Sequence, residues 1–348
     1  MASVLLLTDE DVCEVVGGEA GISHLIDVTD KAFIAEAAGE ASLAPQQWLI
    51  YPPHARHLGQ AEISLNSLFG VVPALNAAGG RIHTIAPGRA RSPGGPRPRP
   101  RGRAWKILFD YESLALACLM EDQWVHDLSV GAHVGAATRH LATKDASIVA
   151  AIGSGAMARG CLRAACAVRD VKEVRVFSPS EEHRAKFVDD MATALGVPVR
   201  AAGSAEEAVR GADIVNCATN NFFRRLGDAV YAYAWLKPGA HVNSIAPNEA
   251  DERTYLEATV IPGSTRGLLE MTPRWEPFTS LVEAGRIPPE HLPGDVGQVA
   301  SGAKPGRTSD EQITLYLGPG IGTHHAAIAG WIYAEARARG IGHTWTFG

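Results

Sequence analysis

The sequence predicts an α/β protein in which a doubly wound parallel sheet of the Rossmann type is joined to an α+β domain completed by the C-terminal tail. The chain has 348 residues, 46% hydrophobic and 20% charged, which is typical of a globular protein with two domains. A glycine-rich turn lies between a strand-like run and a helical run near the middle of the sequence. Beyond it, strand-like and helical runs alternate, and this indicates parallel strands with helices on both faces of the sheet.

Residues 1–144 are predicted to form the α+β domain. A strand at Val4–Leu7 is followed by Thr8, a favourable N-cap, and by acidic residues that suit the first turn of a helix. A second helix is expected at Val28–Ala38. Short apolar runs separated by glycine and proline follow over residues 45–81, and we interpret them as a meander or an irregular sheet.

Residues 87–103, PGRARSPGGPRPRPRGR, form a basic segment too rich in proline for a packed helix or a central strand. We expect a solvated loop. The alternative is that some of its arginines contact an anionic ligand, such as a cofactor phosphate, or an acidic partner surface.

A hairpin and a helix end the first domain. Trp105–Phe109 and Leu114–Met120 are expected to pair as strands. Helical periodicity then covers Asp127–Leu141, where small residues permit close packing against another element. Residues 143–146 form the linker, so the second domain is predicted to occupy residues 145–311.

The glycine-rich turn has the spacing of a dinucleotide-binding motif. Ile148–Ile152 leads into G-x-G-x-x-A at residues 153–158, and a helix and the strand Val174–Phe177 complete a βαβ unit. The first glycine permits the tight turn, the second lets a pyrophosphate approach the backbone, and the alanine allows helix and strand to pack closely. An ordinary strand-to-helix turn is the alternative. The expected cofactor contacts in this loop are Gly153, Ser154, Gly155, Ala156, Met157 and Ala158.

The alternation continues through the second domain. Its expected helices and strands are Glu181–Leu195, Val197–Ala201, Ser204–Val209, Asp213–Ala218, Ala240–Ile245 and Ala258–Pro262. Ligands gather at the carboxyl ends of parallel strands, so Thr219 and Ile245 are expected to face the cofactor. The tail, residues 312–348, contains a helix at Ala326–Arg339 and is expected to return to the first domain.

The residue at the end of the second strand of the βαβ unit indicates whether the protein binds NAD or NADP. An acidic residue there would bind the adenine ribose hydroxyl, but this chain has a serine. Hydroxyl and basic side chains suit a 2′-phosphate, and they favour NADP(H) over NAD(H). Glu181 and Glu182 would argue for NAD if they face the pocket. The expected contacts are Ser178, Ser180, His183 and Arg184.

Composition excludes several other classes of function. The net charge of −6 gives no overall attraction to nucleic acid or to anionic membranes. No apolar run approaches the roughly 18 residues of a membrane helix, and the N-terminal residues lack a signal-peptide pattern. The five cysteines show neither a disulfide framework nor a zinc spacing. We therefore expect a cytoplasmic protein without a metal site.

Several motifs follow one another over nearly the whole length of the chain. They are LLLTDEDV, VVPALNAAGGRIHTIAPG, KILFDYESLALACLMEDQWVHDLSVGAHVGAATRHLA, AIGSGAMARG, EEAVRGADIVNCAT, LKPGAHVNSIAPNEADERT and ITLYLGPGIGTHHAAIAGWIYAEARARGIG. With these motifs in this order, the chain resembles the ornithine cyclodeaminase/mu-crystallin family. The resemblance implies a homodimer whose interface and substrate side come from the first domain and the tail. It implies a cleft between the two domains and hydride transfer at the α-carbon of amino or imino acids.

The catalytic positions depart from the family pattern. The family's lysine falls on Arg81, its carboxylate-binding arginine on Ser129, its acid on Asn248, and an aspartate of its tail helix on His325. Arginine stays charged near neutral pH, so Arg81 could bind a carboxylate or polarise an imine but could hardly relay protons. Asparagine cannot act as a base.

Proton transfer would then need another donor, and His83, His324 and His325 are the candidates because histidine titrates near neutrality. His83 could instead point away from the cleft. Adjacent helical residues point in different directions, so one of His324 and His325 is expected to face the cleft and a shared metal site is not. The expected catalytic residues are Arg81, Asn248, His83 and His325.

The sequence therefore predicts an NAD(P)H-dependent oxidoreductase acting on a C=N bond, of the imine or ketimine reductase or amino-acid dehydrogenase type. Its small-molecule substrate would be an imine, amino acid or keto acid. The alternative is a non-catalytic NADP(H)-dependent ligand-binding protein of the mu-crystallin kind. Ornithine cyclodeamination is less expected, because the catalytic residues differ.

Overall fold

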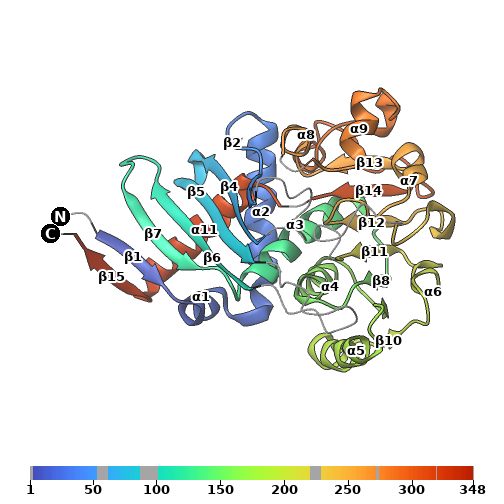
Figure 1. Ribbon diagram of the computed structural model, residues 1–348, viewed down its shortest axis with the longest axis horizontal. Coiled ribbons are helices and arrows are strands. Elements are labelled where there is room, and N and C mark those ends of the chain that lie inside the picture. The colour runs from blue at the N-terminus through green and yellow to red at the C-terminus, as the bar shows by residue number, and fades with distance from the viewer. Residues whose placement is uncertain are drawn as a thin grey trace.

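The computed structural model describes residues 3–52, 62–86, 101–219, 229–271, 274–318 and 320–347. Within these ranges the chain forms an eight-stranded and a seven-stranded sheet, which lie side by side with helices around and between them (Figure 1). One continuous cluster of buried hydrophobic side chains extends from the first sheet through the helices between the sheets to the second. The predicted fold class is confirmed.

The eight-stranded sheet is mostly antiparallel, and its strands follow the order β15-β1-β7-β6-β5-β4-β2, with β3 paired to β4. Its strands are β1 (Ser3–Leu7), β2 (Ser42–Leu43), β3 (Gln47–Tyr51), β4 (Ile63–Val72), β5 (Ala77–Ala86), β6 (Arg101–Asp110), β7 (Leu116–Glu121) and β15 (His343–Thr346). The meander and the hairpin predicted from the sequence are both present. Most of the basic segment at residues 87–103 lies outside the described residues, but its last three residues belong to β6.

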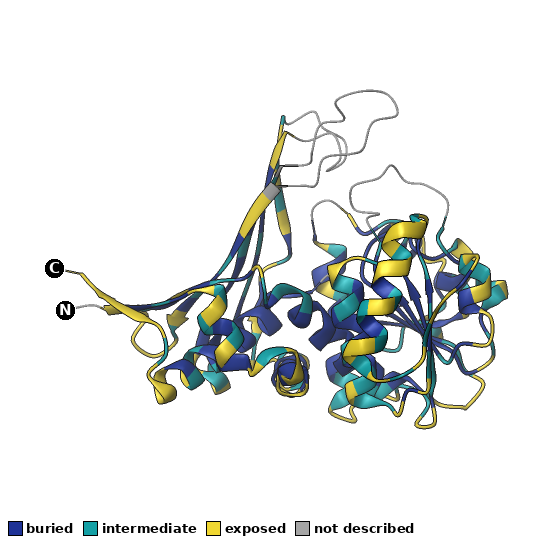
Figure 2. Ribbon diagram, turned by 90° about the horizontal axis from the view of Figure 1, so that it is seen from below, coloured by how far each residue is buried: buried dark blue, intermediate teal, exposed yellow. Residues whose placement is uncertain are grey.

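Helices cover one face of this sheet, and in the described residues none covers the other (Figure 2). Buried and more exposed residues alternate along β4. The buried residues face the helices, because a Cβ at Gly70, one of this set, would lie 2.5 Å from the backbone nitrogen of Thr323 in α11. Arg81 of β5 lies opposite Leu68 of β4 and opposite Lys106 of β6, so all three point toward the helices. The register therefore places two cationic side chains next to each other under the helix layer.

The seven-stranded sheet is entirely parallel, in the order β10-β9-β8-β11-β12-β14-β13. Its strands are β8 (Ile148–Ile152), β9 (Glu173–Phe177), β10 (Val199–Ala201), β11 (Ile214–Cys217), β12 (His241–Ser244), β13 (Thr259–Pro262) and β14 (Thr314–Leu317). The chain enters at β8 and builds outward in both directions. The carboxyl ends of β8 and β11 are neighbours at the point where the strand order reverses, which is where such sheets bind ligands.

The α-helices are α1 (Asp9–Val16), α2 (Ile22–Ala37), α3 (His126–Leu141), α4 (Ala156–Val168), α5 (Glu181–Leu195), α6 (Ala205–Val209), α7 (Glu252–Glu257), α8 (Thr265–Leu269), α9 (Phe278–Glu283), α10 (Val296–Ala300) and α11 (Gly322–Arg339). Helix α3 packs on α4 at close range, because a Cβ at Gly131 would lie 2.4 Å from the carbonyl oxygen of Gly160. Helices α3 and α4 thus join the two sheets. No helix in the described part of the chain is long and apolar enough to span a membrane.

The tail of the chain contributes to both sheets. Strand β14 pairs with β12 and β13, so the return to the first sheet, expected from residue 312, begins only after β14. Helix α11 then crosses the first sheet beside β4 and β5, and β15 pairs with β1. The helix begins at Gly322, four residues before the expected Ala326, and its first turn therefore includes both adjacent histidines.

Candidate active site

A cavity of about 430 Å³ opens at the carboxyl ends of β8, β9 and β11. It is lined by Ile152, Gly153, Ser154, Gly155, Phe177, Ser178, Pro179, Ser180, His183, Ala218, Thr219 and Val230. None of these lining residues is acidic. We refer to this cavity as the nucleotide pocket, because it surrounds the predicted dinucleotide-binding loop.

The loop has the shape that a pyrophosphate requires. Gly153 has φ +120°, and a Cβ there would lie 2.4 Å from the carbonyl oxygen of Ala218, so only glycine fits. A Cβ at Gly155 would meet no atom within 4 Å, which leaves open space in front of the loop. Gly155 is also the N-cap of α4, and no side chain caps this helix. The free N–H groups at a helix N-terminus bind anions, so the loop fits a dinucleotide phosphate.

The predicted cofactor contacts separate into two groups. Seven of them line the nucleotide pocket: Gly153, Ser154, Gly155, Ser178, Ser180, His183 and Thr219. Five do not: Ala156, Met157, Ala158, Arg184 and Ile245. Within the pocket, the Ser154 hydroxyl donates to Ser178 Oγ at 2.9 Å. Arg184 donates from Nη1 to the carbonyl oxygen of Ser178 at 2.7 Å, and its guanidinium lies over the ring of Phe177.

Glu249, which sequence reasoning missed, holds the strand ends beside the pocket. Its fully buried carboxylate accepts hydrogen bonds from the amide and hydroxyl of Thr219, the hydroxyl of Ser244 and the amides of Ile245 and Ala246. Burial raises the pKa of Glu249, and the hydrogen bonds from Thr219 and Ser244 oppose that rise. The side chain ties the end of β11 to the end of β12.

Asn248, an expected catalytic residue, lies in the same turn after β12. Its backbone is left-handed, with φ +59°, a conformation that asparagine tolerates better than most residues. The backbone N–H of Asn248 donates to the backbone carbonyl oxygen of Glu276 at 3.1 Å. The turn places Asn248 at the carboxyl edge of the parallel sheet, as the sequence suggested.

A second group of polar residues lies under the helix layer of the first sheet. Arg81 and Lys106 bind different oxygens of Asp122: Arg81 Nε donates to Oδ2, and Lys106 Nζ donates to Oδ1 at 2.5 Å. The three side chains are 6%, 0% and 0% exposed for Arg81, Lys106 and Asp122, respectively. Two buried cations share one carboxylate, so the group carries a net positive charge.

The charges in this group depend on one another. Burial by itself would raise the pKa of Asp122, but Lys106 and Arg81 hold it below its usual range. Burial lowers the pKa of Lys106, and Asp122 opposes this shift. Removing one member would therefore leave an uncompensated charge in the interior, which is strongly unfavourable.

Each cation also contacts a histidine. Arg81 Nη1 lies 2.5 Å from His83 Nδ1, and Lys106 Nζ lies 3.3 Å from His325 Nδ1. The structure therefore brings three of the four expected catalytic residues into one cluster and adds Lys106 and Asp122, which we did not expect. We call Arg81, His83, Lys106, Asp122 and His325 the central cluster.

The histidines of this region do not titrate near neutrality, contrary to the sequence-based expectation. Burial is the main cause, and neighbouring cations or imidazoles add to it in four of the five. Burial, with Arg81 adding to its effect, lowers the pKa of His83 to about 2. The pKa is lowered to about 3 in His126 and His133 and falls well below its usual value in His324 and His325. These imidazoles are neutral hydrogen-bonding groups at physiological pH.

His324 and His325 have different roles in the first turn of α11. His324 Nδ1 accepts from the amide of Ile321 at 2.9 Å, so His324 caps its own helix, and its ring packs against His133. His325 instead reaches Lys106. Of the two histidines, His325 is therefore the one that belongs to the central cluster.

One face of α3 adds polar atoms to this region. His126, Ser129 and His133 are spaced i, i+3 and i+7, and each has a buried side-chain nitrogen or oxygen with no hydrogen-bond partner among the described residues. His324 Nε2 is likewise buried and has no hydrogen-bond partner among the described residues. Buried polar atoms are normally satisfied, so these atoms offer hydrogen bonds to a bound molecule. His126 is the first residue of α3, one residue before the expected start of this helix.

Two connections bring the central cluster to the nucleotide pocket. Asp127, in the first turn of α3, interacts electrostatically with Asp122 and Arg81 on one side and with Arg159 and Arg163 of α4 on the other. Helix α11 carries His325, and it follows β14, whose carboxyl end lies beside that of β12. The cluster is therefore linked through Asp127 to α4, the helix that begins at the nucleotide pocket, and through α11 to the carboxyl edge of the parallel sheet.

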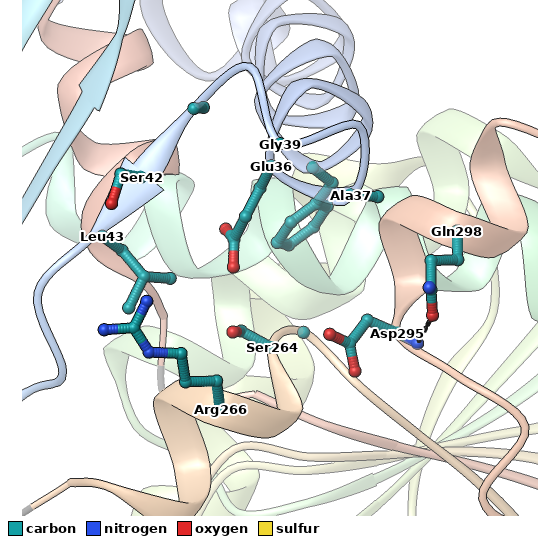
Figure 3. A pocket seen from close by; sticks show the side chains of 12 residues that line it. Glu36, Ala37, Gly39, Ser42, Leu43, Ser264, Arg266, Asp295 and Gln298 are labelled. Atoms are coloured by element: carbon teal, nitrogen blue, oxygen red, sulfur yellow. Dashed lines mark hydrogen bonds between the residues drawn. The ribbon is translucent and has the colours of Figure 1, made fainter.

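A separate cavity of about 330 Å³ lies between α2, α8 and α10 and shares no lining residue with the nucleotide pocket. Figure 3 shows Glu36 reaching from the end of α2 toward Ser264, with Asp295 close by. The Glu36 carboxylate accepts from the hydroxyl of Thr323 at 2.9 Å, and burial raises its pKa. These contacts tie α2 to α8 and α11, and the cavity lies apart from the central cluster.

No group of His, Cys, Asp and Glu side chains in the described part of the chain is arranged to hold a metal ion. The one signal that could have identified Lys106 was its position directly opposite Arg81 in the predicted sheet. That signal required the strand register, which the hydrophobic pattern did not define.

A model of the ornithine cyclodeaminase/mu-crystallin family matches residues 8–340. The chain is 29% identical over 242 residues to a delta(1)-pyrroline-2-carboxylate reductase of Bacillus cereus, and the alignment covers 68% of this chain and 72% of that protein.

Solved structures show the same fold. The delta(1)-pyrroline-2-carboxylate reductase of Thermococcus litoralis, in complex with NADH and L-proline, has a TM-score of 0.83 and 24% identity over 98% of this chain and 99% of that chain. An archaeal alanine dehydrogenase dimer with bound NAD has a TM-score of 0.82 and 25% identity over 99% of this chain and 100% of that chain.

Proposed function

The chain belongs to the ornithine cyclodeaminase/mu-crystallin family, and from this membership we propose that it is a nicotinamide-dependent oxidoreductase acting on a C=N bond or on the corresponding amine. Proteins similar to it include a reductase of a cyclic imino acid and an alanine dehydrogenase. The observation that carries the proposal is the buried central cluster beside the nucleotide pocket. Its net positive charge suits a small substrate with a carboxylate.

The proposed cofactor site is the nucleotide pocket. The loop at Gly153 and Gly155 would hold the pyrophosphate on the N-terminus of α4, and Thr219 would approach the nicotinamide half from the end of β11. When bound, the cofactor supplies or accepts the hydride. The protein would contribute orientation and electrostatics: Arg81 and Asn248 would hold the imine, and the neutral imidazoles of His83 and His325 would donate hydrogen bonds.

We also propose a preference for NADP(H). Hydroxyl groups of Ser178 and Ser180 and the imidazole of His183 line the adenosine end of the pocket, while Glu181 and Glu182 are not among its lining residues. Arg184 is held near this end by its hydrogen bond to the carbonyl oxygen of Ser178. Similar solved structures contain NADH or NAD, so the preference is a proposal about this chain alone.

The experiment is a turnover assay that follows the near-ultraviolet absorbance of the reduced nicotinamide. NADPH and NADH would each be incubated with cyclic imino acids and with 2-oxo acids plus amines. We expect oxidation of NADPH with at least one imine, and a loss of about 10²-fold or more in kcat/KM for Arg81→Ala. The variant Arg210→Ala serves as the control. Arg210 is an exposed residue directly after α6, so its replacement should leave turnover unchanged. Equal or tighter binding of NADH would contradict the cofactor preference.

A non-catalytic ligand-binding protein is the second candidate. The observation in its favour is the low pKa of the buried imidazoles, which leaves no histidine of the central cluster that titrates near neutrality. Tight binding of NADPH without turnover of any imine, amino acid or keto acid would support this candidate over the enzyme.

We propose that the protein is a homodimer formed through the uncovered face of the first sheet. Strand register places six exposed hydrophobic side chains on that face: Leu49, Tyr51, Ile63, Leu65, Phe109 and Leu119. Leu49 is 71% exposed and Tyr51 is 58% exposed. An apolar surface of this kind is typical of an interface with another protein molecule.

A reducing compartment such as the cytoplasm is also proposed. All five cysteines are free, and three of them are buried. Burial raises the pKa of Cys161 and Cys217, which keeps these thiols unreactive.

A further inference from the structure

Asp122 is the centre of a symmetric arrangement. One of its oxygens binds the guanidinium of Arg81 and the other binds the ammonium of Lys106, and the two cations lie opposite each other on neighbouring strands. Beyond Asp122, each cation makes one further polar contact among the described residues, and in both cases the partner is the Nδ1 atom of a histidine. These contacts are Arg81 to His83 at 2.5 Å and Lys106 to His325 at 3.3 Å.

The chemistry of the donors determines which proton each imidazole carries. Guanidinium and ammonium groups have N–H donors and no acceptor, so Nδ1 of His83 and Nδ1 of His325 must each accept. A neutral imidazole that accepts at Nδ1 has its single proton on Nε2. Both histidines therefore present an Nε2–H group.

The exposed fractions of the side chains show that each histidine lies nearer the surface than Lys106. Lys106 is fully buried, whereas its neighbour His325 is 3% exposed and His83 is 9% exposed. His325 Nε2 would lie 3.4 Å from a Cβ at Gly320, so it points to the turn that follows β14 at the carboxyl edge of the parallel sheet. The imidazole of His325 thus lies between the Lys106 ammonium and this turn.

We propose that Lys106 is the proton source of the reaction and that His325 is the relay that connects it to the substrate. This proposal rests on the proposed function. With the bound cofactor supplying the hydride, the imine nitrogen would take the proton of His325 Nε2–H, and His325 Nδ1 would take a proton from the Lys106 ammonium. The N–H bonds at Nε2 and Nζ break, and new N–H bonds form on the product amine and at Nδ1. Lys106 is left as a neutral amine, and the relay resets when His325 Nε2 takes a proton from water and Nδ1 returns its proton to Lys106.

The surroundings of His325 suit this role. The charged or titratable groups that face it are Lys106 and Arg81 from the sheet, His126 from α3 and His324 from its own helix, and each of them disfavours an imidazolium. His325 therefore passes a proton without storing one. Asp122 is a positioning residue in this scheme, because it holds Lys106 and Arg81 at the two imidazoles.

The tautomers can be measured without any substrate. The wild-type protein, labelled with ¹⁵N-histidine, would be studied by long-range ¹H–¹⁵N NMR from about pH 6 to 8, with His325→Gln and His83→Gln used to assign the signals. We expect both imidazoles to be neutral across this range, with the proton on Nε2. A proton on Nδ1 of His325, or titration of His325 within this range, would overturn the proposal, and this wild-type measurement does not depend on any variant that fails to fold.

Variants at Lys106 then test the proton source. In Lys106→Met the Nδ1 donor is lost, so we expect the His325 signals to change and kcat to fall by about 10²-fold or more with little change in KM. Lys106→Arg keeps a donor that cannot release its proton, so it should restore the wild-type His325 spectrum without restoring kcat. Lys186→Met, on the exposed side of α5, is the control and should match the wild type in both measurements.

The outcomes separate this inference from the proposed function. If the His325 spectrum is as expected but no imine is reduced, the proposed function fails and the relay has no reaction to serve. If imines are reduced and Lys106→Met or Lys106→Arg turns over as fast as the wild type, the proposed function stands and the relay is wrong.

Discussion

The carboxylate of Asp127 shows how strongly burial affects single residues near the site. It lies in the first turn of α3, and burial raises its pKa to about 6. A nearby carboxylate, Asp122, adds to this rise, and the arginines of α4 oppose it. Because the pKa is higher in the folded protein than in the unfolded chain, the folded state binds the proton more tightly. Asp127 therefore favours folding at acidic pH, and this contribution is lost as the pH rises from about 4 to about 6.

Asp127→Asn removes this pH dependence. Relative to the wild type, we expect the variant to be more stable at about pH 8 by roughly 1–3 kcal/mol, and the difference should shrink as the pH falls toward about 4. The measurement is the free energy of unfolding by urea at several pH values. Asp170→Asn, whose side chain is 84% exposed, should give no such trend. A constant difference at all pH values would show that the pKa of Asp127 is not raised.

Single residues of the site could be predicted only where a motif or an alignment position marked them. Arg81 and His325 were expected from the family positions, and they meet at the central cluster. Lys106 and Asp122, which lie in or beside apolar strands, were missed because no motif or alignment position marked either of them. A buried charge is recognisable only with its neighbours, and the position of Lys106 opposite Arg81 is known only from the pairing of β5 with β6.

The turn between β8 and α4 separates the structural and ligand-binding roles of its two glycines. Gly153→Ala would force a Cβ against the carbonyl oxygen of Ala218 at a positive φ, so we expect a loss of stability of about 1–3 kcal/mol. A Cβ at Gly155 meets no atom within 4 Å, so Gly155→Ala should leave stability nearly unchanged while its methyl group obstructs the phosphate. Thermal unfolding and NADPH titration of both variants test this contrast. Equal nucleotide affinity in Gly155→Ala and the wild type would contradict the proposed phosphate position.

Elements with strong local signals were predicted with accurate bounds. Helix α5 begins after Ser180, whose hydroxyl accepts from the amide of His183, and ends at Gly196 in the left-handed conformation. Helix α11 was predicted four residues too short, because its N-cap is Ile321, which has no capping side chain. The pairing of β14 with β12 and β13 could not be predicted, since periodicity identifies a strand but not its neighbours.

At the scale of the whole molecule, the uncovered face of the first sheet determines whether the protein is a dimer. Leu65→Glu places a charge in the middle of this apolar face, so we expect the dimer to dissociate at micromolar concentration. Sedimentation equilibrium measures the change. Ala194→Glu, on the exposed surface of α5, is the matched control and should remain dimeric. A wild-type monomer would refute the proposed interface.

The path of the chain also limits how the two sheets can move. The chain passes from one sheet to the other twice: after α3, where it enters β8, and after β14, where it enters α11. Two covalent crossings restrict how far the two sheets can slide apart or twist against each other. His325 lies just beyond the second crossing, so its contact with Lys106 links the first sheet to the turn that follows β14 of the second.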